Sequence, residues 1–501
     1  GQGAGGAARR MAARGLAALR DASLLRPGCL VAGRWGEAGP ARLPVVNPAS
    51  GQVLCELPRL GADAAQEAVA AAAASQKAWA ARTAKERAGI LRRWHTLASE
   101  AAEDLALLAT LECGKPLAEA RAEVGGGLAS IEWFAEEGRR VTGDVLAPAV
   151  RRPQAGLVLK QPVGVVASIT PWNFPVSMVT RKVAPALAAG CTVVLKPSEE
   201  TPLTALALAE LALRAGLPSG TLSVLCGDAP GIGAAVLADE RVRKISFTGS
   251  TRVGKLLMAG AADTVKRVSL ELGGNAPVLV FEDADLEQAA RGAVGSAFRN
   301  SGQTCICANR ILVHDSVHDA FVARVVELVS KIRVGDGTEA GVTQGPMITA
   351  AGVEKAERHV ADARAGGATV AVGGARALPD SGGHFFEPTV LTGVTPDMMC
   401  FREETFGPVC NIVPFSSDEQ ALDLANATEY GLAAYAYTSN LGRAWRVAEK
   451  LEYGIVGVNE PGVTSEVAPF GGWKQSGLGV EHSKYGLDEY LEKKYVCLGL
   501  G

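Results

Sequence analysis

Short β-rich runs that alternate with helical stretches constrain the fold of this chain more than any other feature. The first series of such runs covers residues 163–169, 191–195, 222–225, 244–247 and 268–272. A second series begins after Pro277, with a helix expected around 286–299, a strand at 310–313, and further alternation to about residue 460. This pattern is typical of βαβ units. The sequence therefore predicts an α/β fold with two doubly wound, mainly parallel domains.

Three further segments complete the expected organisation. Thr83 and Glu86 have the spacing of a capping box, and apolar residues then recur at helical spacing, so we expect one long helix over most of 84–111. Residues 147–160 and 490–500 read as extended pieces without helices of their own. Unpaired edge strands often find a partner in another subunit, so these two pieces predict a homo-oligomer.

Composition excludes several classes of function. The chain has 501 residues, 48% of them hydrophobic, and a net charge of −3 with dispersed Lys and Arg, so we expect neither nucleic acid nor a membrane as a partner. Its ten cysteines include no CxxC pair, which favours a reducing compartment and predicts no metal site. A small-molecule substrate remains the expected partner.

The N-terminal segment differs from the rest in composition. Four arginines, at positions 9, 10, 14 and 20, lie among Ala, Gly and Leu before the first acidic residue, Asp21. Residues 1–22 therefore resemble a mitochondrial transit segment, which predicts localisation in the mitochondrial matrix. A disordered Ala/Gly-rich tail is the alternative.

Cys305 is the candidate nucleophile. It lies in the loop Asn300-Ser-Gly-Gln-Thr-Cys-Ile-Cys-Ala-Asn309, among small and polar residues between an expected helix and an apolar run. A reactive thiol needs a partly open, polar site, whereas a structural thiol usually lies within an apolar period. The loop favours reactivity slightly, and a structural cysteine is the alternative.

Two residues at strand ends could assist such a thiol. Glu271 stands in Leu-Glu-Leu-Gly-Gly274, and burial within this apolar strand would raise its pKa and suit it to act as a general base. Asn173, in Pro171-Trp-Asn-Phe-Pro175, could donate a hydrogen bond to a developing oxyanion. A solvent-facing acid and a turn-forming Asn are the alternatives.

Two further strand ends suggest a nucleotide site. Phe247-Thr-Gly-Ser-Thr-Arg-Val-Gly254 places a glycine turn before a helix start, where N–H groups attract phosphate. Lys196 and Glu199, in Lys-Pro-Ser-Glu, follow another strand and could hold ribose hydroxyls. A carboxylate there would repel a 2′-phosphate, which favours NAD over NADP. Taken alone, each motif favours a structural or solvated loop.

Together these motifs resemble the aldehyde dehydrogenase superfamily. Pro-Trp-Asn-Phe-Pro, Lys-Pro-Ser-Glu, Phe-Thr-Gly-Ser, Glu-Leu-Gly-Gly, Gly-Gln-Thr-Cys, Glu403-Glu-Thr-Phe-Gly-Pro408 and Pro469-Phe-Gly-Gly472 occur in the order typical of that family. The resemblance runs from about residue 30 to the C-terminus. It implies a Rossmann-type NAD-binding domain (23–146 and 163–273), a catalytic domain (274–475) and a small β oligomerisation element (147–162 and 476–501), assembled as a tetramer.

The resemblance also implies roles for residues. Cys305 would attack an aldehyde to give a thiohemiacetal, Asn173 would hold the oxyanion, and Glu271 would activate the water that hydrolyses the resulting thioester. The positions expected to bind NAD are Lys196, Pro197, Ser198, Glu199, Gly249, Ser250, Gly254, Glu404 and Phe406.

Two arginines suggest the substrate class. Arg181 and Arg299 flank the expected pocket, and two guanidinium groups could clamp a carboxylate at the far end of a short substrate. This pattern resembles the family members that oxidise succinate semialdehyde to succinate in 4-aminobutyrate degradation, especially the mitochondrial animal ones; glutarate semialdehyde is the alternative substrate. Thr464 replaces a serine usual in related enzymes, which leaves open whether Thr464 or Ser465 contacts the carboxylate.

Cys307 suggests regulation of the same loop. In an extended segment, residues two apart face the same side at a separation suited to a disulfide. A reversible bond between Cys305 and Cys307 would remove the nucleophile and act as a redox switch. A passive second thiol is equally compatible with the sequence.

Overall fold

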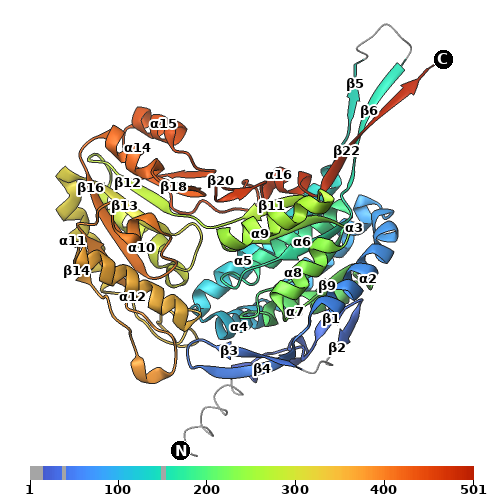
Figure 1. Cartoon of the computed structure of the whole chain (residues 1–501), viewed down its shortest axis with the longest axis horizontal. Coiled ribbons are helices and arrows are strands. Elements are labelled where there is room, and N and C mark those ends of the chain that lie inside the picture. Colours follow the sequence, from blue (N-terminus) through green and yellow to red (C-terminus); the bar gives the residue numbers. More distant parts are fainter. Residues whose placement is uncertain (1–14, 37–40, 148–153, 501) are drawn as a thin grey trace, which may run out of the picture.

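Two large, mostly parallel sheets organise the chain, whose computed structural model describes residues 15–36, 41–147 and 154–500 (Figure 1). Residues 1–14 of the transit-like segment lie outside these ranges. No helix within them is long and apolar enough to cross a membrane. The α/β class and the existence of two sheet-based bodies, as predicted, are confirmed.

The first sheet has eight strands and contains all the strands predicted between 163 and 272. Its central strands pair in parallel in the order β9-β8-β7-β10-β11, and antiparallel strands complete both edges. In spatial order the strands are β2 (Arg34–Gly36), β1 (Cys29–Val31), β9 (Leu222–Val224), β8 (Thr192–Lys196), β7 (Val165–Ile169), β10 (Val242–Thr248), β11 (Arg267–Glu271) and β21 (Gly477–Leu478).

Helices cover both faces of this sheet, which explains why its central strands are apolar almost throughout. One face packs on α2 (Ala62–Ala80), α8 (Ala229–Ala238) and α9 (Thr251–Ala261). The other face packs on a larger group: α3 (Ala84–Glu100), α4 (Ala102–Cys113), α5 (Leu117–Glu137), α6 (Ser177–Ala189) and α7 (Leu203–Arg214).

The single helix predicted over 84–111 is two helices, so that prediction is wrong. The capping box of Thr83 and Glu86 begins α3 as expected. The break falls at Ala101, whose φ of −92° and ψ of 11° leave the helical region. The second helix begins at Ala102, with Asp104 in its first turn. The Asp104 carboxylate accepts the main-chain N–H groups of Arg20 and Asp21, each at 2.9 Å. The helical spacing of apolar residues continues across this one-residue break, so the sequence pattern did not reveal it.

The second sheet has seven strands and follows the first along the chain. All neighbouring pairs are parallel except β14 with β15. In spatial order the strands are β14 (Thr369–Val372), β15 (Thr389–Thr392), β16 (Val409–Phe415), β13 (Ala308–His314), β12 (Ala276–Val280), β18 (Ala433–Tyr437) and β19 (Ile455–Val458). Its helices are α10 (Leu286–Phe298), α11 (His318–Val329), α12 (Ala350–Ala365), α13 (Met399–Arg402), α14 (Asp418–Asn426) and α15 (Leu441–Lys450).

Two small two-stranded sheets lie beside these bodies. They pair β3 (Arg42–Asn47) with β4 (Gln52–Pro58), and β17 (Tyr430–Gly431) with β20 (Trp473–Lys474). A short helix, α16 (Ser483–Asp488), precedes the last strand.

A third, antiparallel sheet forms an arm that projects from the body (Figure 1). The two extended pieces predicted from sequence pair with each other in it, as β6 (Gln154–Pro162) and β22 (Leu491–Gly499). The domain boundaries expected from sequence differ from the strand pairing in two places. β5 (Asp144–Leu146), expected in the first domain, joins the arm, whereas β21, expected in the oligomerisation element, pairs with β11.

Candidate active site

The cysteine loop connects α10 to β13, and two left-handed residues shape it. Asn300 and Ser301 have φ values of 50° and 57°, a conformation that reverses the chain. Beyond them, the N–H of Cys307 donates to the carbonyl of Thr304 at 3.0 Å and closes a turn around Cys305. Residues 305–307 are therefore a turn, and the extended segment assumed in the disulfide argument is wrong.

Cys305 lies where two cavities meet. One has a volume of about 220 Å³ and includes Arg181 (the Arg181 cavity); the other measures about 290 Å³ and includes Glu404 (the Glu404 cavity). Among the described residues, Cys305 alone lines both. Burial raises the pKa of its thiol above the usual range, and the charge of Glu404 adds to the effect while Arg181 opposes it. The resting thiol is therefore protonated, and attack requires removal of its proton.

Asn173 lies beside Cys305 in the Glu404 cavity, in the loop that follows β7. Its carbonyl accepts hydrogen bonds from Lys115 Nζ at 2.6 Å and from Asn300 Nδ2 at 3.0 Å. Its own side-chain Nδ2 donates to the Gln303 carbonyl at 3.0 Å, in the cysteine loop. The expected oxyanion donor is thus held against the loop that carries the thiol.

Glu271 ends β11 and is buried, but it lines neither cavity. Neither carboxylate oxygen has a hydrogen-bond partner within the described chain. Burial raises its pKa well above the usual range, the nearby Glu481 raises it further, and Lys182 and Arg181 oppose both. The raised pKa agrees with the predicted base, whereas its position requires the side chain to turn toward Cys305 before it can act there.

The Glu404 cavity opens at the carboxyl ends of β7, β10 and β11, where ligands gather in parallel sheets. It brings together four predicted cofactor residues: Gly249, Ser250, Glu404 and Phe406. Ser250 also caps α9 through its hydroxyl. The Phe406 ring meets Trp172 edge to face, with centroids 5.5 Å apart, and so forms a rigid wall of the cavity.

Five other predicted cofactor residues lie outside the lining of this cavity. Lys196, Pro197, Ser198 and Glu199 follow β8, next to the loop after β7, where Thr170 N–H donates to the Lys196 carbonyl at 3.1 Å. Lys196 and Glu199 form an ion pair at 2.5 Å. Gly254 serves packing, because a Cβ there would come within 2.4 Å of the Leu272 side chain.

Glu404 is held from two sides. Its carboxylate accepts the N–H of Gly274 at 3.0 Å, and its main-chain carbonyl accepts from Lys355 Nζ at 2.5 Å. Burial raises the pKa of Glu404 to about 7. Lys355 also lines the cavity, and sequence analysis missed it. It lies on the amphipathic helix α12, where a lysine gives no signal that separates it from surface lysines.

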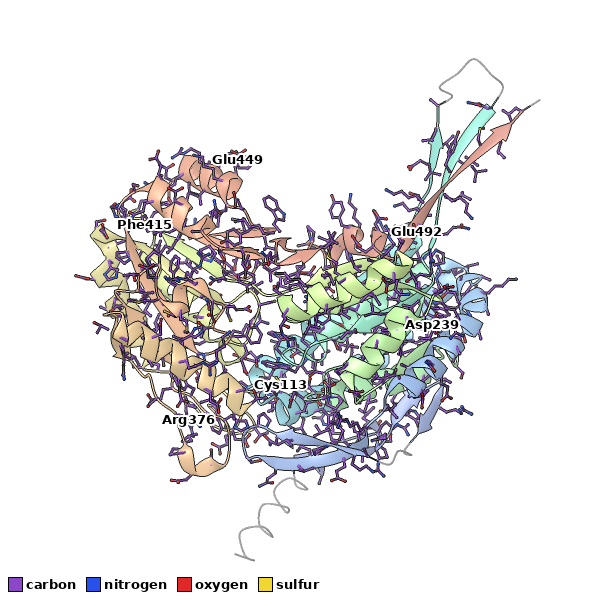
Figure 2. All side chains as sticks on the ribbon, viewed as in Figure 1. Cys113, Asp239, Arg376, Phe415, Glu449 and Glu492 are labelled. Atoms are coloured by element: carbon purple, nitrogen blue, oxygen red, sulfur yellow. The ribbon has the colours of Figure 1, made fainter. Side chains whose placement is uncertain are left out.

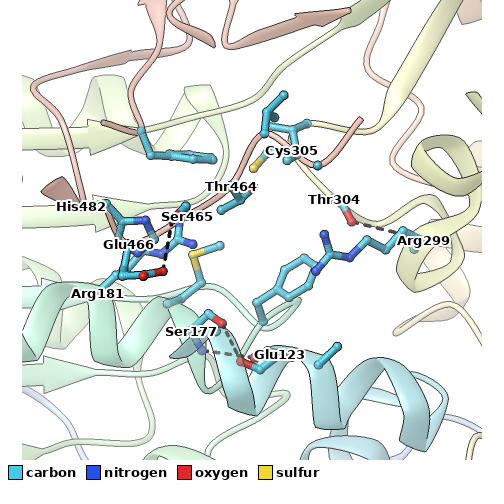
Figure 3. A pocket seen from close by; sticks show the side chains of 18 of the residues that line it. Glu123, Ser177, Arg181, Arg299, Thr304, Cys305, Thr464, Ser465, Glu466 and His482 are labelled. Atoms are coloured by element: carbon cyan, nitrogen blue, oxygen red, sulfur yellow. Dashed lines mark hydrogen bonds between the residues drawn. The ribbon is translucent and has the colours of Figure 1, made fainter. Parts of the chain in front are cut away.

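The Arg181 cavity contains all four predicted substrate residues, Arg181, Arg299, Thr464 and Ser465, together with Cys305 (Figure 3). The guanidinium of Arg181 is buried, and its Nε and Nη1 have no hydrogen-bond partner among the described residues. Its nearest ionic partner, Glu481, is 3.6 Å away, and its face packs over Phe470. A buried guanidinium with unused hydrogen-bond donors is suited to bind an anion.

Arg299 lies on the opposite side of the cavity and is more open to solvent (Figure 3). Its guanidinium stacks over the Phe174 ring at 5.2 Å. Ser465 already donates its hydroxyl to Glu466 at 3.2 Å, and Thr464 lies beside it in the cavity lining. The structure brings the predicted clamp together, with Arg181 as its buried half.

The family model described as the aldehyde dehydrogenase family matches residues 35–496 of this chain. The chain belongs to this family. It is 53% identical to the mitochondrial succinate-semialdehyde dehydrogenase of Oryza sativa over 96% of this chain and 91% of that protein. It is 54% identical to the 3-sulfolactaldehyde dehydrogenase of Pseudomonas putida, over 96% and 99% of the two chains.

A solved structure of an NADP-dependent enzyme from E. coli has the same fold as this aldehyde dehydrogenase. The two superpose with a TM-score of 0.95 at 51% identity, covering 96% of this chain and all of the other. The predicted aldehyde dehydrogenase fold is thereby confirmed. As a family member the chain uses a nicotinamide dinucleotide, and the choice between NAD and NADP is a separate question.

Several buried residues of this aldehyde dehydrogenase escaped sequence analysis. Lys115 and Glu123 form a fully buried ion pair beside Asn173, and His482 lines the Arg181 cavity. None of them lies in a recognisable motif, because only the fold brings 115, 123 and 482 to the site. Within the described chain, no three His, Cys, Asp or Glu side chains gather as a metal site.

Proposed function

We propose that this enzyme oxidises succinate semialdehyde to succinate with NAD. The observation that carries the proposal is the buried Arg181 guanidinium, which shares a cavity with Cys305. Its Nε and Nη1 donate no hydrogen bond to a described residue, and its ionic partner Glu481 lies 3.6 Å from Nη1. A short substrate with an aldehyde at one end and a carboxylate at the other satisfies both groups. The rice relative, named for succinate semialdehyde, supports this choice.

The chain's own residues account for the chemistry at the aldehyde. Once its proton is removed, the Cys305 sulfur attacks the carbonyl carbon, and the oxygen becomes an oxyanion within reach of the Asn173 amide and the Cys305 N–H. The Asn173 amide donates one N–H to the Gln303 carbonyl, and its second N–H can donate to the oxyanion. A bound nicotinamide dinucleotide would accept the hydride, which leaves a thioester on Cys305.

Hydrolysis of that thioester requires a base and a water. We assign the base to Glu271, because burial and Glu481 keep its pKa far above that of an exposed carboxyl. The side chain must rotate toward Cys305 from its buried position. Glu271 then takes a proton from the water, whose oxygen attacks the acyl carbon and displaces the Cys305 sulfur as the C–S bond breaks. The acid product leaves, and return of the proton from Glu271 to the sulfur restores the thiol.

The Glu404 cavity fits a nicotinamide ribose and ring. Its floor carries Glu404, whose carboxylate can accept hydroxyl groups, and its wall carries the aromatic edge of Phe406. We assign Lys196, Pro197, Ser198 and Glu199 to the adenosine end, together with Gly249 and Ser250. A carboxylate at Glu199 disfavours a 2′-phosphate, which supports NAD.

Two alternatives differ in class or in substrate. A thiol hydrolase or acyltransferase would need Cys305 but would have no use for Glu404, Phe406 and Lys196. Another carboxylate-bearing semialdehyde, such as glutarate semialdehyde, would use the same arginines. The rice relative is named for succinate semialdehyde and the P. putida relative for a sulfonated aldehyde, so the substrates in both names have an anionic end.

We further infer a homo-oligomer, with four subunits as the expected number. Side chains project from the arm (Figure 2). Two apolar ones are largely exposed, Val145 with 82% of its area and Tyr495 with 59%. Burial of such side chains against a second copy would stabilise an assembly. Light scattering coupled to size-exclusion chromatography measures the number, and a monomer at micromolar concentration would contradict the inference.

Two finer proposals concern location and regulation. We place the enzyme in the mitochondrial matrix on the strength of its arginine-rich N-terminal composition, which a fluorescent fusion of the full chain would test. We also retain a reversible Cys305–Cys307 disulfide as a redox switch. Both thiols are free in this structure, so the switch would start from the reduced state shown here.

Steady-state kinetics across aldehydes tests the main proposal. With NAD, we expect kcat/KM for succinate semialdehyde to exceed that for butyraldehyde, which lacks the carboxylate, by about 100-fold. Equal values would overturn the substrate assignment. Turnover without any dinucleotide would favour the hydrolase instead.

A further inference from the structure

His482 occupies a backbone conformation that favours glycine. Its φ of 60° and ψ of −178° lie at the edge of a region that residues with a Cβ rarely adopt, and Ser483 follows with a φ of 52°. Strain of this kind persists only where the surroundings impose it, and it concentrates at ligand sites. The position of His482 therefore calls for a reason beyond folding.

His482 lies in the Arg181 cavity, at the end marked by Arg181 (Figure 3). The residue is only 4% exposed, so its ring fills space inside the protein. A hydrogen bond of 3.2 Å between His482 Nε2 and Ser130 Oγ fixes the ring from behind. The ring therefore cannot swing away without losing that bond.

The ring is also electrically neutral at physiological pH. Burial lowers the pKa of His482 well below its usual value, and the charge of Arg181 lowers it further. The positive charge at this end of the cavity therefore belongs to Arg181. His482 contributes volume rather than charge.

We propose that His482 is a specificity-determining residue that limits the length of the substrate. This inference rests on the proposed function, in which the aldehyde lies at Cys305 and the carboxylate at Arg181. The imidazole then takes the room beside Arg181 that additional methylene groups would need. A glycine at this position would relieve the backbone strain and open that room.

Kinetics with ω-oxo acids of four, five and six carbons tests the proposal. In His482→Gly, we expect the ratio of kcat/KM for the five-carbon to the four-carbon acid to rise by about 10-fold, the discrimination that one methylene typically provides. The same variant loses the buried ring and its bond to Ser130, so its stability is compared with that of His482→Ala, which loses the same contacts. His482→Ala should shift the ratio likewise but unfold at a temperature about 1 to 2 °C lower than His482→Gly, because alanine keeps the strained Cβ.

Val265→Gly is the matched control. Val265 also has a positive φ, of 52°, but it is 85% exposed and lines neither cavity. We expect it to gain stability without any change in the substrate ratio.

An unchanged ratio in both His482 variants would overturn the proposal, whatever their stability. Wild-type kinetics separates this result from failure of the proposed function. If the wild type oxidises none of the three acids, the proposed function is contradicted. If the wild type oxidises the four-carbon acid and both variants keep the wild-type ratio, only the role of His482 is contradicted. If His482→Gly does not fold, the ratio in His482→Ala decides.

Discussion

Lys115 donates a hydrogen bond from Nζ to the main-chain carbonyl of Asn173 at 2.6 Å, deep inside the protein. The same ammonium pairs with Glu123, both side chains have no exposed area, and the ammonium packs over the Phe174 ring at 3.9 Å. A buried ion pair thus fixes the backbone that carries the proposed oxyanion donor.

Replacement of Lys115 should be costly for stability. In Lys115→Met the carboxylate of Glu123 stays buried without its cation, so we expect the free energy of unfolding in urea to fall by about 3 to 5 kcal/mol. Adding Glu123→Gln should recover part of the loss, since the amide oxygen can still accept the N–H of Val176. Arg121→Met, which breaks an exposed pair with Glu103, should cost far less, because solvent screens that pair. A similar loss in both variants would contradict this account.

Loss of the Arg181 charge should affect only substrates that carry an anion. In Arg181→Gln, we expect kcat/KM for succinate semialdehyde to fall about 100-fold, or ~3 kcal/mol, while butyraldehyde stays within about threefold of wild type. Arg299→Gln should lose less, because its guanidinium is open to solvent. Equal losses on both aldehydes would point to a structural role for Arg181.

The steady-state rate should rise with pH. The proposed base must be deprotonated to act, and burial raises the pKa of Glu271 well above the usual carboxyl value, so the rise should occur at a pH well above that at which an exposed carboxyl titrates. In Glu271→Gln, we expect a preserved burst of NADH followed by turnover about 100-fold slower and without that rise. A variant that lost the burst as well would place Glu271 before hydride transfer.

The choice of dinucleotide should depend on Glu199. In Glu199→Gln the repulsion of a 2′-phosphate disappears and Lys196 loses its ionic partner, so the ratio of kcat/KM for NADP to that for NAD should rise about 10-fold. Glu200→Gln, next in the same loop, is the control and should leave the ratio unchanged. If the two variants behave alike, Glu199 does not contact the ribose.

Reversible inactivation by oxidants should require Cys307. Burial raises the pKa of Cys307 to about 12, and its Sγ contacts the Arg299 carbonyl at 3.9 Å, so bond formation requires the turn to rearrange. Wild type inactivated by peroxide should regain activity with dithiothreitol, whereas Cys307→Ala should not. Cys410→Ala, at a buried cysteine in β16, should behave as wild type. Unchanged recovery in Cys307→Ala would exclude the switch.

Strands and their ends could be predicted from sequence because parallel, doubly covered strands read as continuous apolar runs. Asn173 and Gly249 follow two such strands and Glu271 ends a third, so their motifs could be placed at one sheet edge before the structure was known. Glu404 and Phe406 were predicted only from the resemblance to the family, because no local sequence pattern identifies them as cofactor residues.

Other features depend on conformation that residue types alone do not encode. The turn at Cys305 follows from the left-handed backbone of Asn300 and Ser301, and the positive φ of His482 lies directly before α16. Lys355 reaches the Glu404 cavity from a helix face that reads as a solvated one. These features arise from tertiary contacts, which override local preference.

Cys305 is the one described residue on which both cavities converge, and this sets a limit for chemical probes. In the proposed function the aldehyde and the dinucleotide occupy different cavities, and Cys305 lines both. A single molecule that filled both cavities would lie against this side chain. The linker of a bisubstrate inhibitor would therefore be the part that meets the sulfur atom.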